Sequence, residues 1–443
     1  MFKNQSLRSE TMEKYKIQNA EELNGELILQ LINRYKLKEV TRLKRLKNYY
    51  TGKHETIINR TMKDPTKPNN KIINPYATYI VDTIGGYFLG KPVNYASSEE
   101  EQMKKIQYVF DSNDEQSLNS RIGKDVSIFG VGYELHYTDE NSETKMAYLD
   151  PQETFMVHDN SIQSKPLAAV RFYEVENYKT QQSVLYAEVY DKDFIYSYIQ
   201  EKDEFRLVDE PEQHYYKEVP VIQYLNNDET IGDFENVLKL IDAYDLSTSD
   251  QMNSLEYFAD AYLVLSGIEA ESEDLEAMKE NRVMLMGEKG TADFLMKGDI
   301  AGVKEYTERL KQDIHTFSFV PNISDESFGT SSGEALKFKL FGLESAVSVK
   351  ERFFKKGLEK RLKLITKFLN TKGGSYDSNS ITMSFTRNMP SNNETIANII
   401  EKLSGILSDK TLISLLPFIE DSAYEIELRE KEKEGSLYES LGK

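Results

Sequence analysis

The longest periodic pattern in the chain is an apolar stripe that spans residues 336–369. Apolar residues recur there every three or four positions, as they do on one face of an α-helix: Leu336, Leu340, Leu343, Val347, Phe354, Leu358, Leu362, Ile365 and Leu369. Such a helix makes about nine turns and is roughly 50 Å long, whereas helices of globular proteins usually run roughly 8–20 residues. The stripe predicts a helix that crosses a large assembly, with Gly342 and Gly357 as candidate bends.

Patterns of two other kinds precede this stripe. Residues 20–50 have helical periodicity, residues 61–71 form a loop with two prolines, and a second helical or mixed stretch follows to about residue 90. From about Gly130 to Asn226 the chain changes to short segments rich in Val, Tyr, Phe and Ile, separated by turn residues. These segments predict an antiparallel β region with hairpins. The fold class is therefore α+β.

Helical periodicity returns at Ile231, continues to about Leu265, and is found again in residues 304–317. The insert between them, about residues 267–302, predicts a helix that starts at SEDLEAMKEN and a β-hairpin of RVMLMG and ADFLMKG. After the long stripe, ITMSFTR predicts a strand. Ser391 and Glu394 then have the spacing of a capping box that opens a C-terminal helical region.

Composition excludes several classes of protein. The chain has 443 residues, of which 39% are hydrophobic and 29% charged, which suits roughly two to four globular domains. It has no cysteine, so disulfides and thiolate metal sites are excluded. No apolar run approaches the roughly 20 residues of a membrane span, and the N-terminus lacks the apolar segment of a secretory signal. We expect synthesis in the cytoplasm and no membrane contact.

The formal net charge of −19 argues against a general DNA-binding surface, which normally has a basic footprint. The charge is uneven, because residues 350–367 carry eight Lys or Arg and two Glu, and residues 34–53 are also basic. From composition alone, we interpret both segments as solvated helix faces that balance acidic neighbours.

No enzyme motif is complete. Gly85–Lys91 matches G-x-x-x-x-G-K, but Pro92 follows where a P-loop needs the Ser or Thr that binds Mg²⁺. The five histidines are scattered and have no metal-ligand spacing, and no G-x-S-x-G elbow is present. We therefore expect no enzyme activity, no cofactor and no bound metal.

The stretch FGTSSGEALKFKLFGLE, residues 328–344, has the glycines and serines of a phosphate-binding loop before a helix. Ser331 and Glu334, however, have the spacing of a capping box, in which each side chain bonds the backbone amide of the other residue. Glu334 then occupies the positive end of the helix, where a phosphate would otherwise bind. The motif predicts a capped helix start in preference to a tight phosphate site.

Several stretches, in one order along the chain, resemble the portal proteins of tailed bacteriophages, of the type found in siphophages of Gram-positive hosts. They are Asn70–Tyr95, Ile128–Glu140, Leu149–Asp159, Val320–Glu344 and Ile381–Thr395. None of them is a catalytic signature, and the resemblance rests on their order and coverage.

The resemblance implies a portal fold with a mixed α/β wing, two stem helices, a small α/β clip, a long helix and a helical crown. The implied parts are N-terminal helices and β-rich wing 1–230, stem helix 231–266, clip 267–302, second stem helix 303–321, tunnel loop 322–335, long wing helix 336–370, wing strand 371–391 and crown helices 392–443.

The same resemblance implies a function and partners. Portal proteins form a dodecameric ring at one capsid vertex, the conduit for viral genome packaging and ejection and the head-tail connector. The implied partners are other copies of the chain, double-stranded DNA in the channel, the terminase large subunit, the head-completion adaptor, and the major capsid and scaffolding proteins. The location is the virion, after assembly in the bacterial host cytoplasm. Another head-tail connector, such as an adaptor, and a nucleotide-binding enzyme using Gly85–Lys91 are the alternatives.

Within this resemblance, the tunnel loop would face the DNA through Asp325, Glu326, Ser327, Phe328, Gly329, Thr330, Ser331, Ser332, Gly333 and Glu334. Just inside the following helix, Lys337 and Lys339 could make transient phosphate contacts or salt bridges between subunits. Both interpretations of these two lysines remain open. A channel lining with few basic side chains suits DNA that must slide, because affinity grows steeply with each neutralised phosphate.

Overall fold

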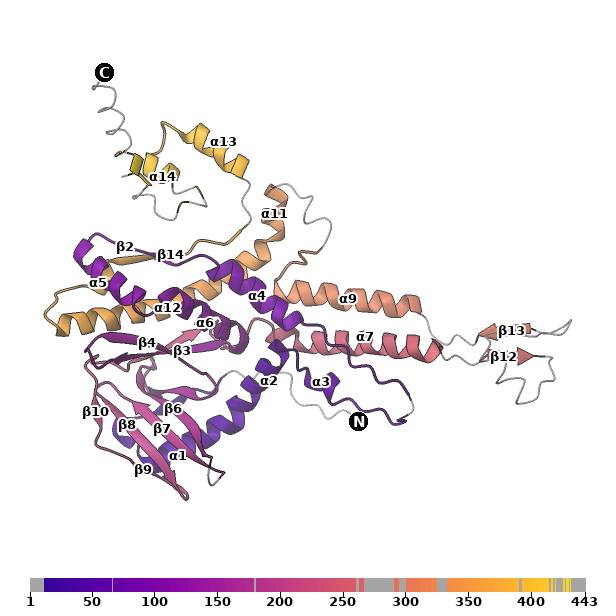
Figure 1. The fold of residues 1–443 in the computed structure, drawn as a ribbon, viewed down its shortest axis with the longest axis horizontal. Coiled ribbons are helices and arrows are strands. Elements are labelled where there is room, and N and C mark those ends of the chain that lie inside the picture. Colours follow the sequence, from indigo (N-terminus) through magenta and orange to yellow (C-terminus); the bar gives the residue numbers. More distant parts are fainter. Residues whose placement is uncertain are drawn as a thin grey trace. The chain divides into compact units, whose positions relative to one another are not determined.

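The computed structural model describes residues 12–65, 67–178, 181–259, 263–266, 291–294, 300–324, 333–389, 393–413, 416, 419, 425–426, 428–429 and 431. The chain forms two units, Met1–Thr386 and Arg387–Lys443. All described strands belong to the first unit (Figure 1). The second contains α13 (Asn393–Leu403) and α14 (Asp409–Ile413). Ser391 of the predicted capping box lies outside the described residues.

Helices predominate before residue 130. The helix predicted for residues 20–50 is present as α1 (Gly25–Tyr35) and α2 (Thr41–Tyr50), joined by the π-helical turn η2 (Lys36–Val40). Asn24 caps α1, because its side chain accepts a hydrogen bond from the Leu27 amide at 2.9 Å. The other elements are η1 (Ala20–Glu22), α3 (Glu55–Ile58), α4 (Tyr76–Leu89), β2 (Asn94–Ser97), α5 (Glu100–Asp111) and α6 (Glu115–Phe129).

The predicted antiparallel β region is confirmed, and it forms two sheets. The larger has seven strands in the order β1-β5-β6-β7-β8-β10, with β9 paired to β8. Its strands are β1 (Tyr15–Ile17), β5 (Thr154–Asp159), β6 (Pro166–Asn177), β7 (Gln182–Tyr190), β8 (Phe194–Glu201), β9 (Glu204–Leu207) and β10 (Glu212–Gln213). Only β1 pairs in parallel among these described strands. The smaller sheet has the order β11 (Val221–Leu225), β3 (Val131–Thr138), β4 (Thr144–Leu149).

The next part contains η3 (Glu235–Val237) and the helices α7 (Leu238–Ala259) and α9 (Ile300–Ser318). The helical stripe predicted to continue to about Leu265 is wrong at its end. Residues Leu263–Ser266 form strand β12, which pairs antiparallel with β13 (Thr291–Phe294). A short apolar run fits a strand and a buried helix equally well, so periodicity could not separate them. Of the predicted hairpin, RVMLMG lies outside the described residues.

The predicted long helix is divided into α11 (Gly333–Lys339) and α12 (Phe341–Thr371). Leu340 separates the two, although its amide donates to the Leu336 carbonyl at 3.0 Å and its carbonyl accepts from the Glu344 amide at 2.8 Å. Helical bonding therefore passes through the division, which lies beside the predicted bend at Gly342. After η4 (Ser378–Ser380), the strand predicted for ITMSFTR is present as β14 (Ile381–Ser384), paired antiparallel with β2.

Gly357 is a point of close approach, and α12 continues through it. A Cβ atom at this position would lie 2.3 Å from Cδ1 of the Tyr224 ring, which belongs to β11. Glycine therefore lets α12 pack directly on the three-stranded sheet, where any larger side chain would push the two apart. Gly357 therefore has a packing role, and its part as a candidate bend stays a prediction.

The basic segment 350–367 is only partly a solvated face. Arg361 is fully buried and forms ion pairs with Glu134 on β3, at 2.5 Å, and with Glu115 on α6, at 2.6 Å. Its Nη1 also donates to Asn119 at 2.7 Å, and Glu134 accepts a further bond from the Tyr224 hydroxyl at 2.9 Å. One guanidinium thus ties α12 to both α6 and the small sheet.

Lys350 is the second buried cation of α12. Its Nζ lies 2.7 Å from Asp233 and also donates to the hydroxyl of Ser127. Buried charges are tolerated when they are paired and hydrogen-bonded. The composition-based interpretation of a solvated face is therefore wrong for Lys350 and Arg361, which hold the long helix in place.

An extended segment, residues 70–74, lies along one face of α7. The amides of Asn70, Ile72 and Asn74 donate to the side chains of Asn253, Ser249 and Asp245, at 2.6, 3.0 and 2.9 Å. Alternate residues of a strand-like segment advance about 6.6 Å, and four helical residues advance about 6 Å. The two spacings match, so three polar side chains of α7, at positions i, i+4 and i+8, each accept a hydrogen bond from one backbone amide of the segment.

Candidate functional site

The predicted tunnel loop is described only at its two ends. Asp325–Ser332 lie outside the described residues, as does the Ser331–Glu334 capping box, while Gly333 and Glu334 begin α11. The site is therefore built from the segment that enters the loop, residues 319–324, and from the helices that leave it.

The entering segment is fixed by a tyrosine of α4. The Tyr79 hydroxyl donates to the carbonyl of Pro321 at 2.7 Å and accepts from the amide of Ile323 at 3.2 Å. Val320 beside them is fully buried. One side chain thus satisfies two backbone groups of a segment that has left its helix, which holds the loop's first residues in one conformation.

His315, in the last turns of α9, holds the same segment from the other side. Its Nδ1 lies 3.0 Å from the Val320 carbonyl oxygen, which can only accept, so Nδ1 carries the proton. Burial lowers the pKa of His315, so the ring is neutral at neutral pH. The rings of Tyr76 and Tyr79 meet it edge-on, with centroids 5.8 and 5.7 Å away.

The turn between α9 and the loop contains a strained residue. Phe319 has a φ of +60°, the left-handed region that a bulky side chain rarely adopts. Its ring is more than half exposed, and its Cδ1 lies 3.5 Å from the position of a Cβ on Gly342. The turn into the loop therefore lies beside the start of α12, the helix that follows α11.

Helix α4 also contacts α12, which follows the loop and α11. The Tyr87 hydroxyl donates to Glu344 of α12 at 2.7 Å. Tyr79 and Tyr87 are two helical turns apart on α4, so one helix fixes the chain before and after the loop. No sequence motif marked either tyrosine, because their partners lie more than 240 positions away.

Lys337 and Lys339 are both exposed on α11, and Phe338 beside them is exposed as well. Their positions are compatible with either of the contacts predicted for them. Glu334 begins the same helix, but its side chain lies outside the described part of the chain.

Gly85–Lys91 does not form a nucleotide-binding loop. Gly85 and Gly86 lie inside α4, which continues to Leu89, and Gly90 ends the helix at φ −70° and ψ −11°. A P-loop needs free amides before a helix begins, whereas here the glycine amides lie within a helix. The structural basis for the nucleotide-binding alternative is therefore absent.

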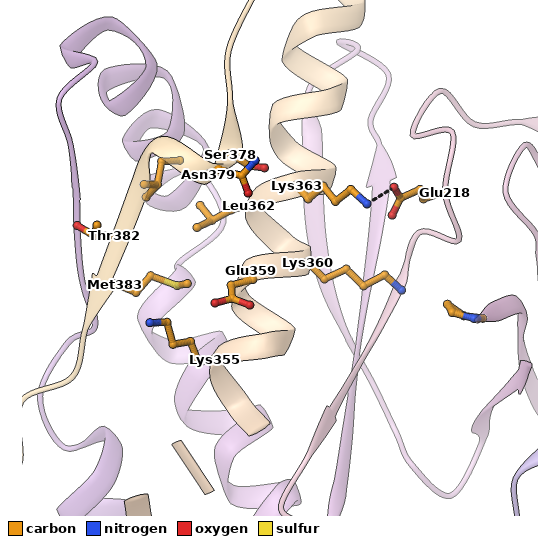
Figure 2. Close-up of a pocket in the computed structure, with 12 residues that line it drawn as sticks. Glu218, Lys355, Glu359, Lys360, Leu362, Lys363, Ser378, Asn379, Thr382 and Met383 are labelled. Carbon is orange, nitrogen blue, oxygen red and sulfur yellow. Dashed lines mark ion pairs between the residues drawn. The ribbon is translucent and has the colours of Figure 1, made fainter. Parts of the chain in front are cut away.

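A separate pocket of about 760 Å³ lies between α12 and β14, and it is drawn in Figure 2. Lys363 lies 2.6 Å from Glu218, and Lys360 donates to the Val221 carbonyl at 3.0 Å. Burial lowers the pKa of Lys360 to about 8. Three lysines line the pocket, and two of them, Lys360 and Lys363, thus have partners within the subunit. None of the described loop residues lines it.

The described residues contain neither a candidate metal site nor a helix that could span a membrane. No group of three or more His, Asp or Glu side chains there is placed to hold a metal ion. Within the same residues, every helix is too short or too polar to cross a membrane.

The comparisons with known proteins bear on the family to which the chain belongs. The family model described as "Phage portal protein, SPP1 Gp6-like" matches residues 29–437. The chain belongs to this portal protein family. The resemblance of its sequence to the portal proteins of phages of Gram-positive hosts is confirmed, and the family is a structural component of the phage particle.

Two relatives are themselves named portal proteins. That of Bacillus phage SPP1 is 25% identical over 433 residues, which cover 93% of this chain and 84% of the relative. That of Clostridium phage phiCD119 is 26% identical over 432 residues, which cover 88% of this chain and 92% of the relative. Among solved structures, a chain of the "Neck of empty GTA particle computed with C6 symmetry" matches with a TM-score of 0.46 and 11% identity, covering 80% of this chain and 90% of that one.

Proposed function

We propose that this portal-family chain forms a dodecameric ring at one vertex of a phage capsid. The ring is the conduit through which DNA enters during packaging and leaves during ejection. The observation that carries the proposal is the family match over residues 29–437. The chain works in the virion, after assembly in the bacterial host cytoplasm, and has no catalytic site of its own.

Each part of the proposed ring subunit corresponds to particular segments of the chain. Residues 1–230, α12 and β14 form the wing, α7 and α9 the stem, and residues 392–443 the crown. The clip begins after Ala259. Strand β13 lies within the clip, and β12 pairs with it, so we assign β12 to the clip as well. The clip receives the terminase large subunit during packaging and the head-completion adaptor afterwards, while the wing contacts the major capsid and scaffolding proteins.

The tunnel loop, residues 322–335, faces the DNA and makes only weak contacts with it. The segment that enters the loop is held on α4 by Tyr79, and Tyr87 of the same helix bonds Glu344 of α12, beyond the loop and α11. In a chain with a net charge of −19, Lys337 and Lys339 offer few phosphate contacts. DNA affinity rises with each neutralised phosphate, so a lining of this kind lets DNA slide in both directions.

Deleting residues 325–332 tests the role of the loop while leaving both tyrosine contacts in place. We expect the variant to form rings that negative-stain microscopy cannot tell from the unmodified rings, and to package DNA poorly in a terminase-driven assay. Normal packaging by these rings would remove the tunnel-loop assignment. If the unmodified chain formed no rings, the portal function itself would be contradicted instead.

Tyr79→Phe tests the base of the loop more gently. Removing the hydroxyl leaves the Pro321 carbonyl and the Ile323 amide without this partner, at a cost of about 1 kcal/mol. We expect rings to assemble and the packaging rate to fall, by less than in the deletion. Tyr108→Phe is the matched control, since its exposed hydroxyl donates only to Glu143 within the described residues. If the Tyr79→Phe variant packaged DNA as well as the Tyr108→Phe control, the Tyr79 hydroxyl would have no role in loop function.

A further inference from the structure

A row of side chains on one face of the seven-stranded sheet leads to the pocket between α12 and β14. In the register of the sheet, His158 on β5 lies opposite Lys16 on β1 and opposite Pro166 on β6. Residues opposite one another on neighbouring strands point to the same face of a sheet. Pro166 and Lys360 both line the pocket. The row that contains Lys16 and His158 therefore ends at the pocket wall to which Lys360 belongs.

Three lysines at this place, Lys14, Lys16 and Lys360, form what we call the basic cluster. Lys14 lies two positions before Lys16, so the two share one side of the extended chain. Both are exposed, and neither forms an ion pair with another described residue. Lys360 donates to the carbonyl of Val221 at 3.0 Å, a neutral acceptor that leaves the lysine charge uncancelled. The cluster therefore has an excess of positive charge.

The two acids that line the pocket do not remove this excess. Glu218 lies 2.6 Å from Lys363, as Figure 2 shows, and it also pairs with Lys367. Its single charge is thus shared by two other lysines. Glu359 lies about one helical turn from Lys355 on α12, so it opposes the charge of that lysine.

His158 lies in the field of the basic cluster. Its Nδ1 atom is buried and has no hydrogen-bond partner among the described residues. Burial, followed by the charges of the basic cluster, lowers the pKa of His158 to about 4, so the ring is neutral at pH 7. Asp159 acts on this pKa in the opposite direction, but its carboxylate already accepts hydrogen bonds within its own turn.

We propose that the basic cluster and His158 bind an oxyanion of the phosphate type, either free or as a phosphate of a nucleic acid. Lysine ammonium groups make charge-assisted hydrogen bonds to phosphate oxygens. A protonated histidine donates from both ring nitrogens, so Nδ1 of His158 gains a partner when the anion is bound. Because the anion offsets the lysine charges, it favours the protonated ring, and binding takes up a proton as the pH falls.

Isothermal titration calorimetry of the whole chain with sulfate tests this site. Sulfate is the probe because its charge stays constant between about pH 5 and 8, where histidines titrate. Ionic strength is held constant with chloride, so that general screening is the same throughout. We expect a single saturable site per subunit, whether or not the subunits have assembled. Heats that rise without saturation would overturn the proposal.

Two lysine variants test which residues bind the anion. We expect Lys16→Met and Lys360→Met each to weaken sulfate binding about tenfold, as the loss of one charged hydrogen bond does. Lys356→Met is the matched control, because it removes the same charge from an exposed position of α12. Lys16 is exposed as well, so its variant remains informative if Lys360→Met fails to fold. Equal sulfate affinity of Lys16→Met and Lys356→Met would overturn the site.

The role of His158 is tested by the pH dependence of binding. A nearby anion that raises its pKa by about one or two units makes sulfate binding on the order of two- to tenfold tighter at pH 5 than at pH 7. We expect His158→Gln to bind sulfate at both pH values without this difference. The same difference in His158→Gln as in the unmodified chain would overturn the assignment of His158.

Competition separates the two sources of the anion. If a short DNA duplex displaces sulfate from the unmodified chain and not from Lys16→Met, a nucleic-acid phosphate is the ligand. If the duplex leaves sulfate bound, the site takes a free oxyanion.

Discussion

Helix α12 and the α7–α9 pair use their side chains in opposite ways. On α12, Arg361 and Lys350 are buried in ion pairs, and Gly357 fits against the Tyr224 ring. On α7 and α9, hydroxyl and amide groups join the helices, and apolar side chains of both helices stay exposed. The difference shows that α12 is packed within one subunit, whereas the α7–α9 pair leaves apolar surface unburied there.

The largest expected effect on subunit stability is at Arg361. In Arg361→Met the buried carboxylates of Glu134 and Glu115 lose their cation, and removing one partner of a buried pair typically costs about 3–5 kcal/mol. Urea denaturation of the monomer measures this loss. The control is Arg352→Met on the exposed face of α12, expected to change stability by less than about 0.5 kcal/mol. Equal effects of the two variants would show that the network contributes nothing.

The same network gives α12 a pH dependence. Burial by itself would raise the pKa of Glu134, but the charge of Arg361 and the bond from His136 lower it from 4.5 to about 2. A depressed carboxyl pKa stabilises the fold above the unfolded pKa, and that contribution is lost as the pH falls through the folded value. We expect stability to fall between pH 4.5 and 2. In Arg361→Met the Glu134 contribution to this fall should disappear, which denaturation curves at several pH values can show.

A smaller effect is expected where α12 approaches the sheet. Gly357→Ala places a Cβ within 2.3 Å of Tyr224, and overpacking of this kind costs about 1–3 kcal/mol although alanine favours helix. Gly86→Ala in α4 is the matched control, because a Cβ there meets no atom within 4 Å, and a gain of about 0.5–1 kcal/mol is expected. A lower unfolding temperature for Gly357→Ala together with a higher one for Gly86→Ala would support the close approach. A higher unfolding temperature for Gly357→Ala would contradict it.

The smallest effect is expected between α7 and α9. Thr307→Val removes the hydroxyl that accepts from Gln251 and bonds Ser247, a loss of about 0.5–1.5 kcal/mol. In the monomer we expect faster hydrogen exchange along α7 and α9 and little change in global unfolding. Thr316→Val, at an exposed position of α9, is the control. If Thr307→Val destabilised the monomer as much as Arg361→Met, the contrast between the two regions would fail.

Much of the fold could be predicted from local periodicity. The helices at residues 25–50 and 341–371 and the antiparallel strands after residue 130 have strong patterns of their own. Strand β12 was taken for helix because its four residues, three of them apolar, take their conformation from β13, which is distant in sequence. The helix division at Leu340 lies two residues before Gly342, which the sequence marked only as a candidate bend.

The candidate site could be predicted only in part. The glycine-serine loop was recognisable as a segment, but the residues that hold its ends were not. Tyr79 bonds Pro321 across 242 positions, and Arg361 bonds Glu134 across 227. In the sequence Tyr79 is one of 28 tyrosines and Arg361 one cation in a basic run. Such long-range polar contacts depend on the fold that brings the two segments together.

The most direct test of the account is electron microscopy of the purified unmodified chain, with symmetry counting of end-on views. The account predicts rings with a central channel and twelve copies. Monomers and dimers alone, over a wide range of concentration and salt, would contradict it.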